Sequence, residues 1–394
     1  MESNKINFYV IANAALGPSL SGGDRIFIEL SRRWAQRGHR VHVLVWEEGH
    51  EMCRRNKLNN VNFIVWSTSH YKRLGFALLY VARTLKGCLE SLRFRDPGNG
   101  KSVIYSASDF WPDSLPALLM KRRMKTSKWV AGFYMFAPQP IGNQVYKGID
   151  KIKGLAYFLS QKPIHWLIRR YADMVFVTNE LDRTAFIGDR LGSSNVIAIR
   201  GGVDIDSSQK VPSPPEKKFD AVFVGRFHAQ KGILELIDIW KYVVVRRKNA
   251  RLAIIGEGEL KREILREIAR HGLERNVVLF GFKDGKEKIA IFKQSKMVLH
   301  PAIYDSGGMG PCEAMACGLP GISFDLPALR VYYPRGMLKV RCFNIQEFAE
   351  SILLLLEDET LYRKLQAEAV HLAKDWDWNV LAESTFRLMK SLFL

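Results

Sequence analysis

Short apolar runs rich in β-branched residues alternate with amphipathic stretches along the chain. In its first half these runs are "KINFYVIA", "HRVHVLVW", "SVIYSAS", "WVAGFYMF", "MVFVTN" and "NVIAIR". Stretches between them, such as "GGDRIFIELSRRWAQRG", place apolar residues at helical spacing. Strands that alternate with helices in this way predict βαβ units and a parallel sheet.

A second series of the same kind follows a polar stretch. "GGVDIDSSQKVPSPPEKK" contains three prolines and has the composition of a linker. The next apolar runs are "FDAVFVGRF", "ARLAIIGEG", "NVVLFGF", "KMVLHPAIY" and "PGISFD". The α/β pattern predicts two doubly wound, Rossmann-like domains, over residues 1–204 and 205–372. In such folds ligands bind at the carboxyl ends of the strands, and here we expect a site in the cleft between the domains.

Length and composition agree with a globular protein of two domains. The chain has 394 residues, of which 47% are hydrophobic and 25% charged. No apolar run reaches the roughly 18 residues of a membrane-spanning helix. The run "INFYVIANAALGPSL" lacks a basic start and contains two asparagines, so we expect a buried strand there and not a signal peptide.

The five cysteines are scattered and form no CxxC pair. Their number is odd, and their spacing predicts neither a disulfide framework nor a structural zinc site. This usage suits a reducing compartment, and we expect a cytoplasmic protein.

Positive charge is concentrated in the first domain. The chain carries a net charge of +19, and residues 1–204 hold 30 Lys and Arg against 16 Asp and Glu. The excess indicates an anionic partner, which would be nucleic acid, anionic lipid or a phosphorylated substrate, or it serves solubility alone. The segments "MKRRMKTSKW" and "KPIHWLIRRY" mix cations with apolar residues, and we expect peripheral contact with an anionic membrane surface there.

Glycine turns that follow predicted strands are candidate phosphate sites. Gly22 and Gly23 precede a predicted helix, where backbone N–H groups can bind an anion, although a tight turn explains them equally well. In "VFVGRFHAQKG", Arg226 and Lys231 flank a strand-to-helix turn. Two cations at the start of a helix suit a diphosphate, and the alternative is a pair of solvated surface charges.

The stretch "YDSGGMGPCEAMACG" sets two acids around a glycine loop. It matches neither the dinucleotide fingerprint nor the P-loop. Pro311 is expected to be the first residue of a helix that ends before Gly318, which would place Glu313 in the first turn. Simple roles exist for both acids, since Glu313 can compensate the helix dipole and Asp305 can accept hydrogen bonds in a turn.

Taken in order, "VGRFHAQKG", "IIGEGELKREI", "NVVLFGF" and "VLHPAIYDSGGMGPCEAMACGLP" resemble the retaining glycosyltransferases of family 4, which have the GT-B fold. The resemblance covers nearly the whole chain and is most specific over residues 222–320. It implies that the N-terminal domain binds the acceptor and the C-terminal domain binds a nucleotide sugar. It also implies that the final helix, within residues 373–394, crosses back to the N-terminal domain.

The resemblance assigns roles to individual residues. Arg226 and Lys231 match the pair that binds the donor diphosphate. Asp305 matches the first acid of the family motif, which faces the sugar. Glu313 matches the second acid, which holds the ribose hydroxyls through a carboxylate that accepts two donors.

Further positions match the walls of the donor pocket. Backbone groups are expected to contact the diphosphate, the sugar or the base at these positions: Gly22, Gly23, Gly225, Gly256, Gly258, Phe282, Lys283, Gly307, Gly308 and Met309. The donor would be a UDP- or GDP-type sugar, and the acceptor a glycan or a lipid-linked glycan of the cell envelope.

Departures from the family pattern fall where sugar and acceptor are recognised. The first acid is usually Glu and is Asp305 here, and Gly307 replaces an aromatic residue. The histidine usual in the N-terminal domain is missing, and Tyr134 and Met135 lie near its position. Asp109 is a candidate for the acceptor side, or else a turn or capping residue.

No metal or other cofactor is expected. The DxD spellings in "VDIDSS" and "DWDW" fall in the linker and before the last helix, not after a strand. The alternatives are an epimerase or phosphorylase on the same fold, and a sugar-nucleotide-binding protein without catalysis. Nucleic-acid binding is a further alternative because of the basic charge, but no recognisable binding module supports it, and no specific nucleic acid is expected.

Overall fold

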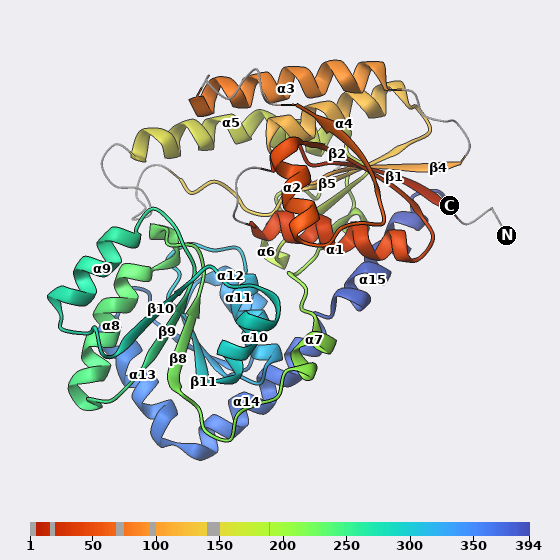
Figure 1. Cartoon of the computed structure of the whole chain (residues 1–394). Coiled ribbons are helices and arrows are strands. Elements are labelled where there is room, and N and C mark those ends of the chain that lie inside the picture. The colour runs from red at the N-terminus through yellow and green to blue at the C-terminus, as the bar shows by residue number, and fades with distance from the viewer. Residues whose placement is uncertain (1–4, 16–19, 68–74, 95–99, 140–149, 189) are drawn as a thin grey trace. The chain divides into compact units, whose positions relative to one another are not determined.

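The computed structural model describes residues 5–15, 20–67, 75–94, 100–139, 150–188 and 190–394 (Figure 1). The chain divides into two compact units. The first consists of Met1–Ala137, Ile152–Arg200 and Trp378–Leu394, and the second of Pro138–Lys151 and Gly201–Asp377. Each unit is built on its own parallel sheet, as the alternating pattern predicts.

The sheet of the first unit has the strand order β3-β2-β1-β4-β5-β6-β7, and all its pairings are parallel. Its strands are β1 (Ile6–Ile11), β2 (Arg40–Trp46), β3 (Asn62–Trp66), β4 (Lys101–Ser106), β5 (Lys128–Gly132), β6 (Met174–Val177) and β7 (Val196–Ala198). The order reverses between β1 and β4, which makes the carboxyl ends of these two strands the expected ligand position.

Helices follow the strands of this sheet. They are α1 (Gly22–Gln36), α2 (Glu47–Arg55), α3 (Gly75–Arg93), α4 (Trp111–Arg123), α5 (Asp150–Tyr171), α6 (Glu180–Arg183) and the 3-10 turn η3 (Ser193–Asn195). The C-terminal helix α15 (Trp378–Ser391) belongs to this unit, as expected. It packs on α1, where Arg33 Nε donates to Asn379 Oδ1 at 3.0 Å, and Phe386 stacks on His39 at 4.4 Å between ring centroids.

The sheet of the second unit repeats the plan with the order β10-β9-β8-β11-β12-β13. Its strands are β8 (Phe219–Val224), β9 (Leu252–Ile255), β10 (Val277–Gly281), β11 (Ser295–His300), β12 (Gly321–Phe324) and β13 (Met337–Val340). Its helices are α7 (Ile205–Lys210), η4 (Ala229–Lys231), α8 (Ile233–Arg246), α9 (Lys261–Arg270), α10 (Gly285–Lys293), α11 (Met309–Ala316), α12 (Pro327–Tyr332), α13 (Ile345–Glu357) and α14 (Glu359–Lys374). Here the order reverses between β8 and β11.

Both faces of the second sheet are buried, so its strands read as continuous apolar runs. Along β8, Phe223 enters one core cluster with α8 and α13, while Val222 enters the other with α11 and α14. Side chains of successive residues alternate between the faces, as the period of a strand requires. The packed sheet therefore holds the ends of β8 and β11 rigidly side by side.

The two basic segments that were expected to contact a membrane differ in the exposure of their apolar residues. In the segment 120–129, Met120, Met124 and Trp129 are buried. The prediction that this segment presents apolar residues together with its cations is therefore wrong. In the segment 162–171, which lies on α5, Trp166 is 59% exposed. No helix within the described part of the chain is long and apolar enough to cross a membrane.

Candidate active site

The turn after β8 carries two cations and depends on a glycine. Arg226 is exposed, and its guanidinium has no hydrogen bond or ion pair with a described residue. Lys231 ends the 3-10 turn η4, and Gly232 follows with a φ of +64°. A Cβ at position 232 would lie 1.8 Å from the carbonyl oxygen of Pro301. Only glycine therefore lets this turn reach the segment after β11.

That close approach brings Lys231 to an acid on the neighbouring strand's loop. Lys231 Nζ lies 2.5 Å from Asp305 Oδ2, and His300 Nε2 lies 3.1 Å from the same oxygen. His300 is the last residue of β11 and is 2% exposed. Asp305 and His300 are buried side chains, and Lys231, which is 17% exposed, joins them at the point where the strand order of the second sheet reverses.

The charges in this cluster are set by pairing within a buried site. Burial favours the protonated form of Asp305, but Lys231 and His300 together outweigh it and hold the pKa of Asp305 well below its usual range. Burial lowers the pKa of His300, and the bond to Asp305 opposes it only in part. Nδ1 of His300 is buried without a partner among the described residues. The cluster thus pairs the ionised carboxylate of Asp305 with Lys231, and burial favours the neutral form of His300.

The glycine loop after Asp305 leads into α11. Asp305 Oδ1 accepts hydrogen bonds from Ser306 N at 2.9 Å and from Gly307 N at 3.4 Å, so the acid also shapes the turn. Gly308, the N-cap, has a φ of +90°, and a Cβ there would lie 2.9 Å from His300 Nε2. No described side chain caps this helix start. The first N–H groups of α11 are therefore available to an anion.

The helix begins two residues earlier than the sequence suggests. Pro311 is the third residue of α11, not the first, and Glu313 lies beyond the first turn. The predicted place of Glu313 in the first turn is therefore wrong, and the alternative role of compensating the helix dipole is not supported, because that effect is confined to the first turn. Gly318 has a φ of +87° just after the C-cap, which agrees with the expected helix end.

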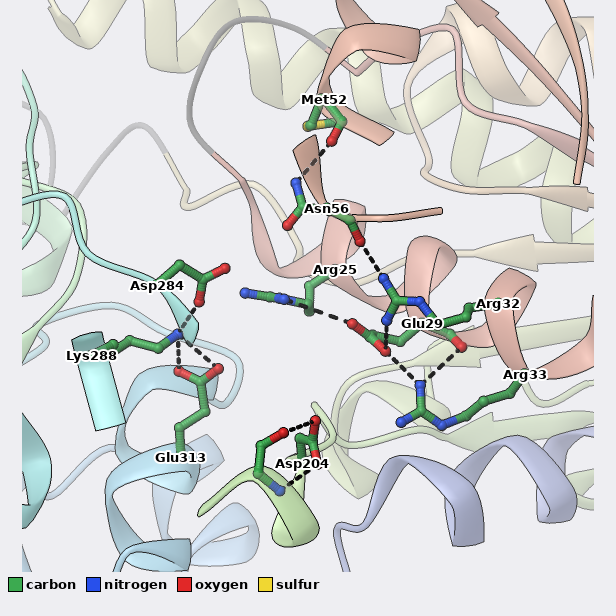
Figure 2. A network of polar contacts seen from close by, with 11 residues as sticks. Arg25, Glu29, Arg32, Arg33, Met52, Asn56, Asp204, Asp284, Lys288 and Glu313 are labelled. Atoms are coloured by element: carbon green, nitrogen blue, oxygen red, sulfur yellow. Dashed lines mark hydrogen bonds and ion pairs between the residues drawn. The ribbon is translucent and has the colours of Figure 1, made fainter. Parts of the chain in front are cut away.

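Glu313 is instead held by a buried lysine (Figure 2). Lys288 Nζ lies 2.9 Å from Glu313 Oε1 and 2.8 Å from Oε2, and 2.8 Å from Asp284 Oδ1. The Lys288 side chain is 10% exposed, whereas that of Glu313 is 22% exposed. One cation thus fixes the orientation of Glu313 and leaves its carboxylate accessible.

Two further turns at this sheet edge pack against each other through glycines. A Cβ on Gly256 would lie 1.9 Å from the carbonyl oxygen of Gly225, and one on Gly258 would lie 2.5 Å from that of Phe227. These glycines are therefore required for the contact between the loops after β8 and β9. That these glycines also line a ligand pocket remains a prediction.

Phe282 and Lys283 follow β10 at the same edge. The Phe282 side chain is 56% exposed, and Lys283 Nζ lies 3.3 Å from Glu287 Oε2 on α10. Neither side chain is committed to the core, so the expected contact through main-chain groups is compatible with this position and remains a prediction.

Gly22 and Gly23 begin α1 in the first unit. The helix start is closed by a capping box, in which Asp24 N donates to Ser21 Oγ and Ser21 N donates to Asp24 Oδ2. A Cβ on Gly23 would lie 3.1 Å from a ring carbon of Tyr134. Close packing and the cap account for this turn within the unit, and its contact with a donor stays a prediction.

The acceptor candidate Asp109 is buried in the first unit. Gln161 of α5 donates from Nε2 to Asp109 Oδ2 at 2.8 Å and to the carbonyl oxygen of Met135 at 3.0 Å. Burial raises the pKa of Asp109 to about 6, against the opposing effect of Gln161. The N-cap of α4 is Phe110, so Asp109 is not a capping residue. Tyr134, near the missing histidine, bonds to the hydroxyl of Tyr105.

A second buried acid bridges the ends of β1 and β4. Asp113 Oδ1 accepts from Ala14 N at 2.9 Å, and Oδ2 accepts from Ser108 Oγ at 2.5 Å. The side chain forms no ion pair with any residue in the described ranges, and burial raises its pKa to about 8. Asp113 is therefore largely protonated at neutral pH, in contrast with Asp305.

The DxD spellings have structural roles. Asp204 caps α7 by accepting from Ser207 N at 2.9 Å, and Asp375 is the C-cap of α14. In the described part of the chain no three His, Cys, Asp or Glu side chains are grouped as metal ligands. Independence from metal remains a prediction.

Residues 204–371 match the protein family described as "Glycosyl transferases group 1". The second unit carries a group 1 glycosyltransferase domain. The matched range contains all the paired charges at the ends of β8 and β11.

Relatives of this glycosyltransferase domain extend the comparison. An uncharacterized glycosyltransferase of Methanocaldococcus jannaschii is 25% identical over 357 residues, which cover 78% of this chain and 85% of that protein. The poly(glycerol-phosphate) alpha-glucosyltransferase of Bacillus subtilis is 24% identical over 181 residues. That match covers 44% of this chain and spans only 26% of the Bacillus protein.

The fold of both units has a solved counterpart. The structure of HepE from Anabaena, in complex with UDP and glucose, superposes with a TM-score of 0.71 at 16% identity. It covers 98% of this chain and 99% of that protein. This confirms the predicted GT-B fold.

Within the glycosyltransferase domain, the structure unites Lys231 and Asp305 and sets Glu313 on the helix that follows. Sequence reasoning missed His300 and Lys288. His300 ends a strand directly before Pro301, a position that could have marked it, and Lys288 lies one helical turn after Asp284. In the first unit it missed Asp113 and Gln161, whose importance depends on burial that no local motif signals.

Proposed function

We propose that the protein is a retaining, metal-independent glycosyltransferase that moves a sugar from a nucleoside diphosphate to a hydroxyl acceptor. The single observation that carries this proposal is the Lys231–Asp305 pair beside the uncapped start of α11. A cation, a carboxylate and free N–H groups meet where the strand order reverses, which is the usual ligand position of such sheets. The complex of HepE with UDP and glucose supports a UDP-type donor.

The diphosphate would bind between the turn after β8 and the start of α11. Arg226 is exposed and unpaired among the described residues, so it can turn to a phosphate oxygen. Lys231 would exchange part of its bond with Asp305 for a bond to phosphate. The N–H groups of Met309 and Gly310 supply further donors, and together these groups neutralise the charge of the leaving diphosphate.

The remaining contacts fix the nucleoside and the sugar. Glu313, oriented by Lys288, would accept hydrogen bonds from the ribose hydroxyls. Asp305 is kept ionised by Lys231, so it can accept from sugar hydroxyls. Phe282 and Lys283 would hold a uracil or guanine base through main-chain groups.

In the transfer step the acceptor oxygen bonds to the anomeric carbon from the face that the diphosphate leaves. The bond from that carbon to the β-phosphate oxygen breaks, and its electron pair departs with the diphosphate. The acceptor proton passes to a phosphate oxygen of the leaving group, so no protein base is required. The configuration of the sugar is retained.

The acceptor would be a glycan or lipid-linked glycan of the cell envelope, bound by the first unit. The activity named for the Bacillus relative, on poly(glycerol phosphate), supports an anionic acceptor. The excess of positive charge over residues 1–204 fits such a substrate. The reaction would take place on the cytoplasmic side of the membrane.

A thermal-shift panel of UDP-, GDP-, ADP- and TDP-sugars tests donor binding first. At a hundred times the dissociation constant a ligand adds about 2.7 kcal/mol of stability, which raises Tm by about 3 °C when a chain of this length unfolds cooperatively. We expect a shift for one base class, and a shift at most about half as large with Lys231→Ala at the same concentration. No shift with any donor would overturn the proposal.

The transfer reaction is tested with the donor so identified and a panel of poly(glycerol phosphate) and polyprenyl-diphosphate glycans. We expect nucleoside diphosphate release that depends on acceptor and persists in EDTA, with an α-linked product from an α-linked donor by NMR. Acceptor-independent conversion of the donor would indicate an epimerase. Donor binding without turnover on any acceptor would indicate a binding protein.

A further inference from the structure

Helix α3 presents an apolar stripe to solvent. Its members recur every three or four residues and are 45–61% exposed: Leu78, Val81, Leu85, Leu89 and Leu92. That spacing places them on one face of a helix. In a helix that serves only the protein core, this face would be buried.

The opposite face of α3 is buried and polar. Arg83, Thr84, Gly87 and Ser91 are the buried residues there. Arg83 Nη1 donates to the carbonyl oxygens of Asn13 and Ala15, at 3.3 and 3.2 Å. The helix is therefore inverted, because its polar side faces the protein and its leucines face outward. An inverted helix needs an apolar environment outside the unit.

Helix α5 repeats the outward stripe. Ile152, Leu155, Leu159 and Trp166 are 43–69% exposed and are spaced by three, four and seven residues. Nine of the 22 large apolar side chains that are exposed in the described chain lie on α3 and α5. This concentration on two helices distinguishes them from scattered surface residues, which need no explanation.

Both helices are held by α4, on the same unit (Figure 1). Trp111 N donates to Tyr80 Oη of α3 at 2.9 Å, and Trp111 Nε1 donates to the carbonyl oxygen of Ser160 of α5 at 2.9 Å. The ring of Phe110 lies between those of Tyr80 and Tyr157. The two helices that carry the stripes are therefore tied to the same support, α4.

The helices that carry the two apolar stripes, α3 and α5, also carry an excess of positive charge. Helices α3 and α5 together contain eight Lys and Arg against two Asp and Glu, and one of those acids, Glu90, pairs with Lys86 and Arg93. Lys162, Arg169 and Arg170 are exposed on α5. Arg170 and Arg122 of α4 both stack on Tyr171. A second copy of the chain would bring like charges together, which disfavours a self-association surface.

We propose that α3 and α5 form a docking surface for an anionic lipid bilayer. The leucine stripe and Trp166 would enter the boundary between headgroups and acyl chains, and the cations would bind the anionic headgroups. The protein would lie on the membrane plane. The proposal rests on exposure and charge alone and does not depend on the transfer reaction.

Co-sedimentation with vesicles tests this surface. We expect the full-length protein to bind vesicles of phosphatidylglycerol and phosphatidylcholine (1:1) at 50 mM salt, and to bind pure phosphatidylcholine at least tenfold more weakly. The variant Leu85→Glu/Leu89→Glu should lose at least tenfold in affinity for the anionic vesicles. Lys162→Gln and Arg170→Gln should each lose about fivefold. The matched control is Leu354→Glu, because Leu354 is 49% exposed on α13 of the other unit.

Circular dichroism and thermal melting check that each variant is folded, and Leu159→Glu on α5 is a second probe if the α3 variant is not. Unchanged vesicle binding by a folded stripe variant would overturn the proposal. It would also be overturned if sedimentation velocity showed a dimer that the same leucine substitutions dissociate, since a second copy would then be the occupant.

Discussion

In each unit an aspartate links the two strand ends between which the strand order reverses. The two aspartates have pKa values shifted in opposite directions. In the first unit Asp113 ties the end of β1 to the end of β4 through hydrogen bonds, and burial raises its pKa to about 8. In the second unit Asp305 ties β11 to the turn after β8 through Lys231 and stays ionised. The same position in the fold can therefore carry a neutral, hydrogen-bonded link or a charged one. We call the contacts of Asp113 with Ala14 and Ser108 the neutral joint, and the Lys231–Asp305 pair the charged joint.

The difference follows from what each loop carries. The loop after β8 contains a lysine, and Gly232 lets it reach across to Asp305. In the described part of the loop after β1, backbone N–H groups of Asn13 and Ala14 approach Asp113, and no cation pairs with it. A charged joint can exchange its partner for a phosphate group, whereas a neutral joint mainly preserves shape. We therefore assign donor chemistry to the second unit and interpret Asp113 as structural.

The largest effect is expected from the glycine that makes the charged joint. Gly232→Ala would put a Cβ 1.8 Å from the Pro301 oxygen at a φ of +64°, and we expect a loss of about 3 kcal/mol or more in unfolding free energy. The matched change Gly23→Ala in the first unit meets only a ring carbon at 3.1 Å and should stay within about 1 kcal/mol. Urea unfolding of both variants measures this. Equal losses would contradict the steric argument.

The cations of the charged joint come next. Lys231→Ala and Arg226→Ala should each lower turnover at least tenfold, which is about 1.4 kcal/mol of transition-state stabilisation. Lys241→Ala removes an exposed cation from α8 as a control and should stay near the wild-type rate. Initial rates of sugar transfer provide the measurement. Normal rates in both site variants would remove the diphosphate assignment.

The neutral joint predicts an unusual pH dependence of stability. Because the folded pKa of Asp113 lies above the value of about 4 in an unfolded chain, the folded state keeps a proton that the unfolded state loses. Stability should therefore fall as pH rises from about 4 to 8, by up to about 1.4 kcal/mol per pH unit.

The variant Asp113→Asn isolates the contribution of Asp113 to the pH dependence of stability. The amide can accept from Ala14 N and donate to Ser108 Oγ, so the fold should be kept and the loss between pH 6 and 8 reduced. Asp109, with a pKa of about 6, also titrates in the lower part of that window, but it contributes equally in both proteins. Chemical denaturation at pH 6, 7 and 8 measures the slopes. Parallel slopes would show that Asp113 is ionised in the folded state.

The smallest effect concerns the nucleoside. Glu313→Gln removes one charge but keeps Lys288 paired with Asp284, so we expect KM for the donor to rise about fivefold with kcat within twofold. Glu287→Gln, at an exposed carboxylate on α10, is the control. A fall in kcat with unchanged KM would place Glu313 at the reacting sugar instead of the ribose.

All the central strands were predicted from the sequence, and so were two of the four edge strands, β7 and β10. The runs of β1 and β8 are continuous and apolar because these strands are covered on both faces. The strands that were not predicted, β3 and β13, are the other two edge strands, where the exposed Asn62 and the half-buried Lys339 interrupt the apolar pattern. The start of α11 was misplaced for a different reason: proline is favoured at the first position of a helix, but Pro311 is accommodated at the third position here.

Site residues were predictable only where spacing carried the signal. The turn that carries Lys231, and the acids Asp305 and Glu313 eight residues apart, are local features that can be recognised in the sequence. Lys288 and His300 act through contacts across the sheet edge, and their burial depends on tertiary packing. The inverted faces of α3 could not be assigned either, since helical spacing shows that one face is apolar but not which face points outward.

Titration calorimetry of wild-type protein and Lys231→Ala with UDP, GDP, ADP and TDP tests the central claim most directly. We predict that one nucleoside diphosphate binds the wild type with a Kd below 1 mM, and that Lys231→Ala weakens it at least tenfold, about 1.4 kcal/mol. Absence of binding by all four, or equal affinity in the variant, would contradict a donor site at the Lys231–Asp305 pair.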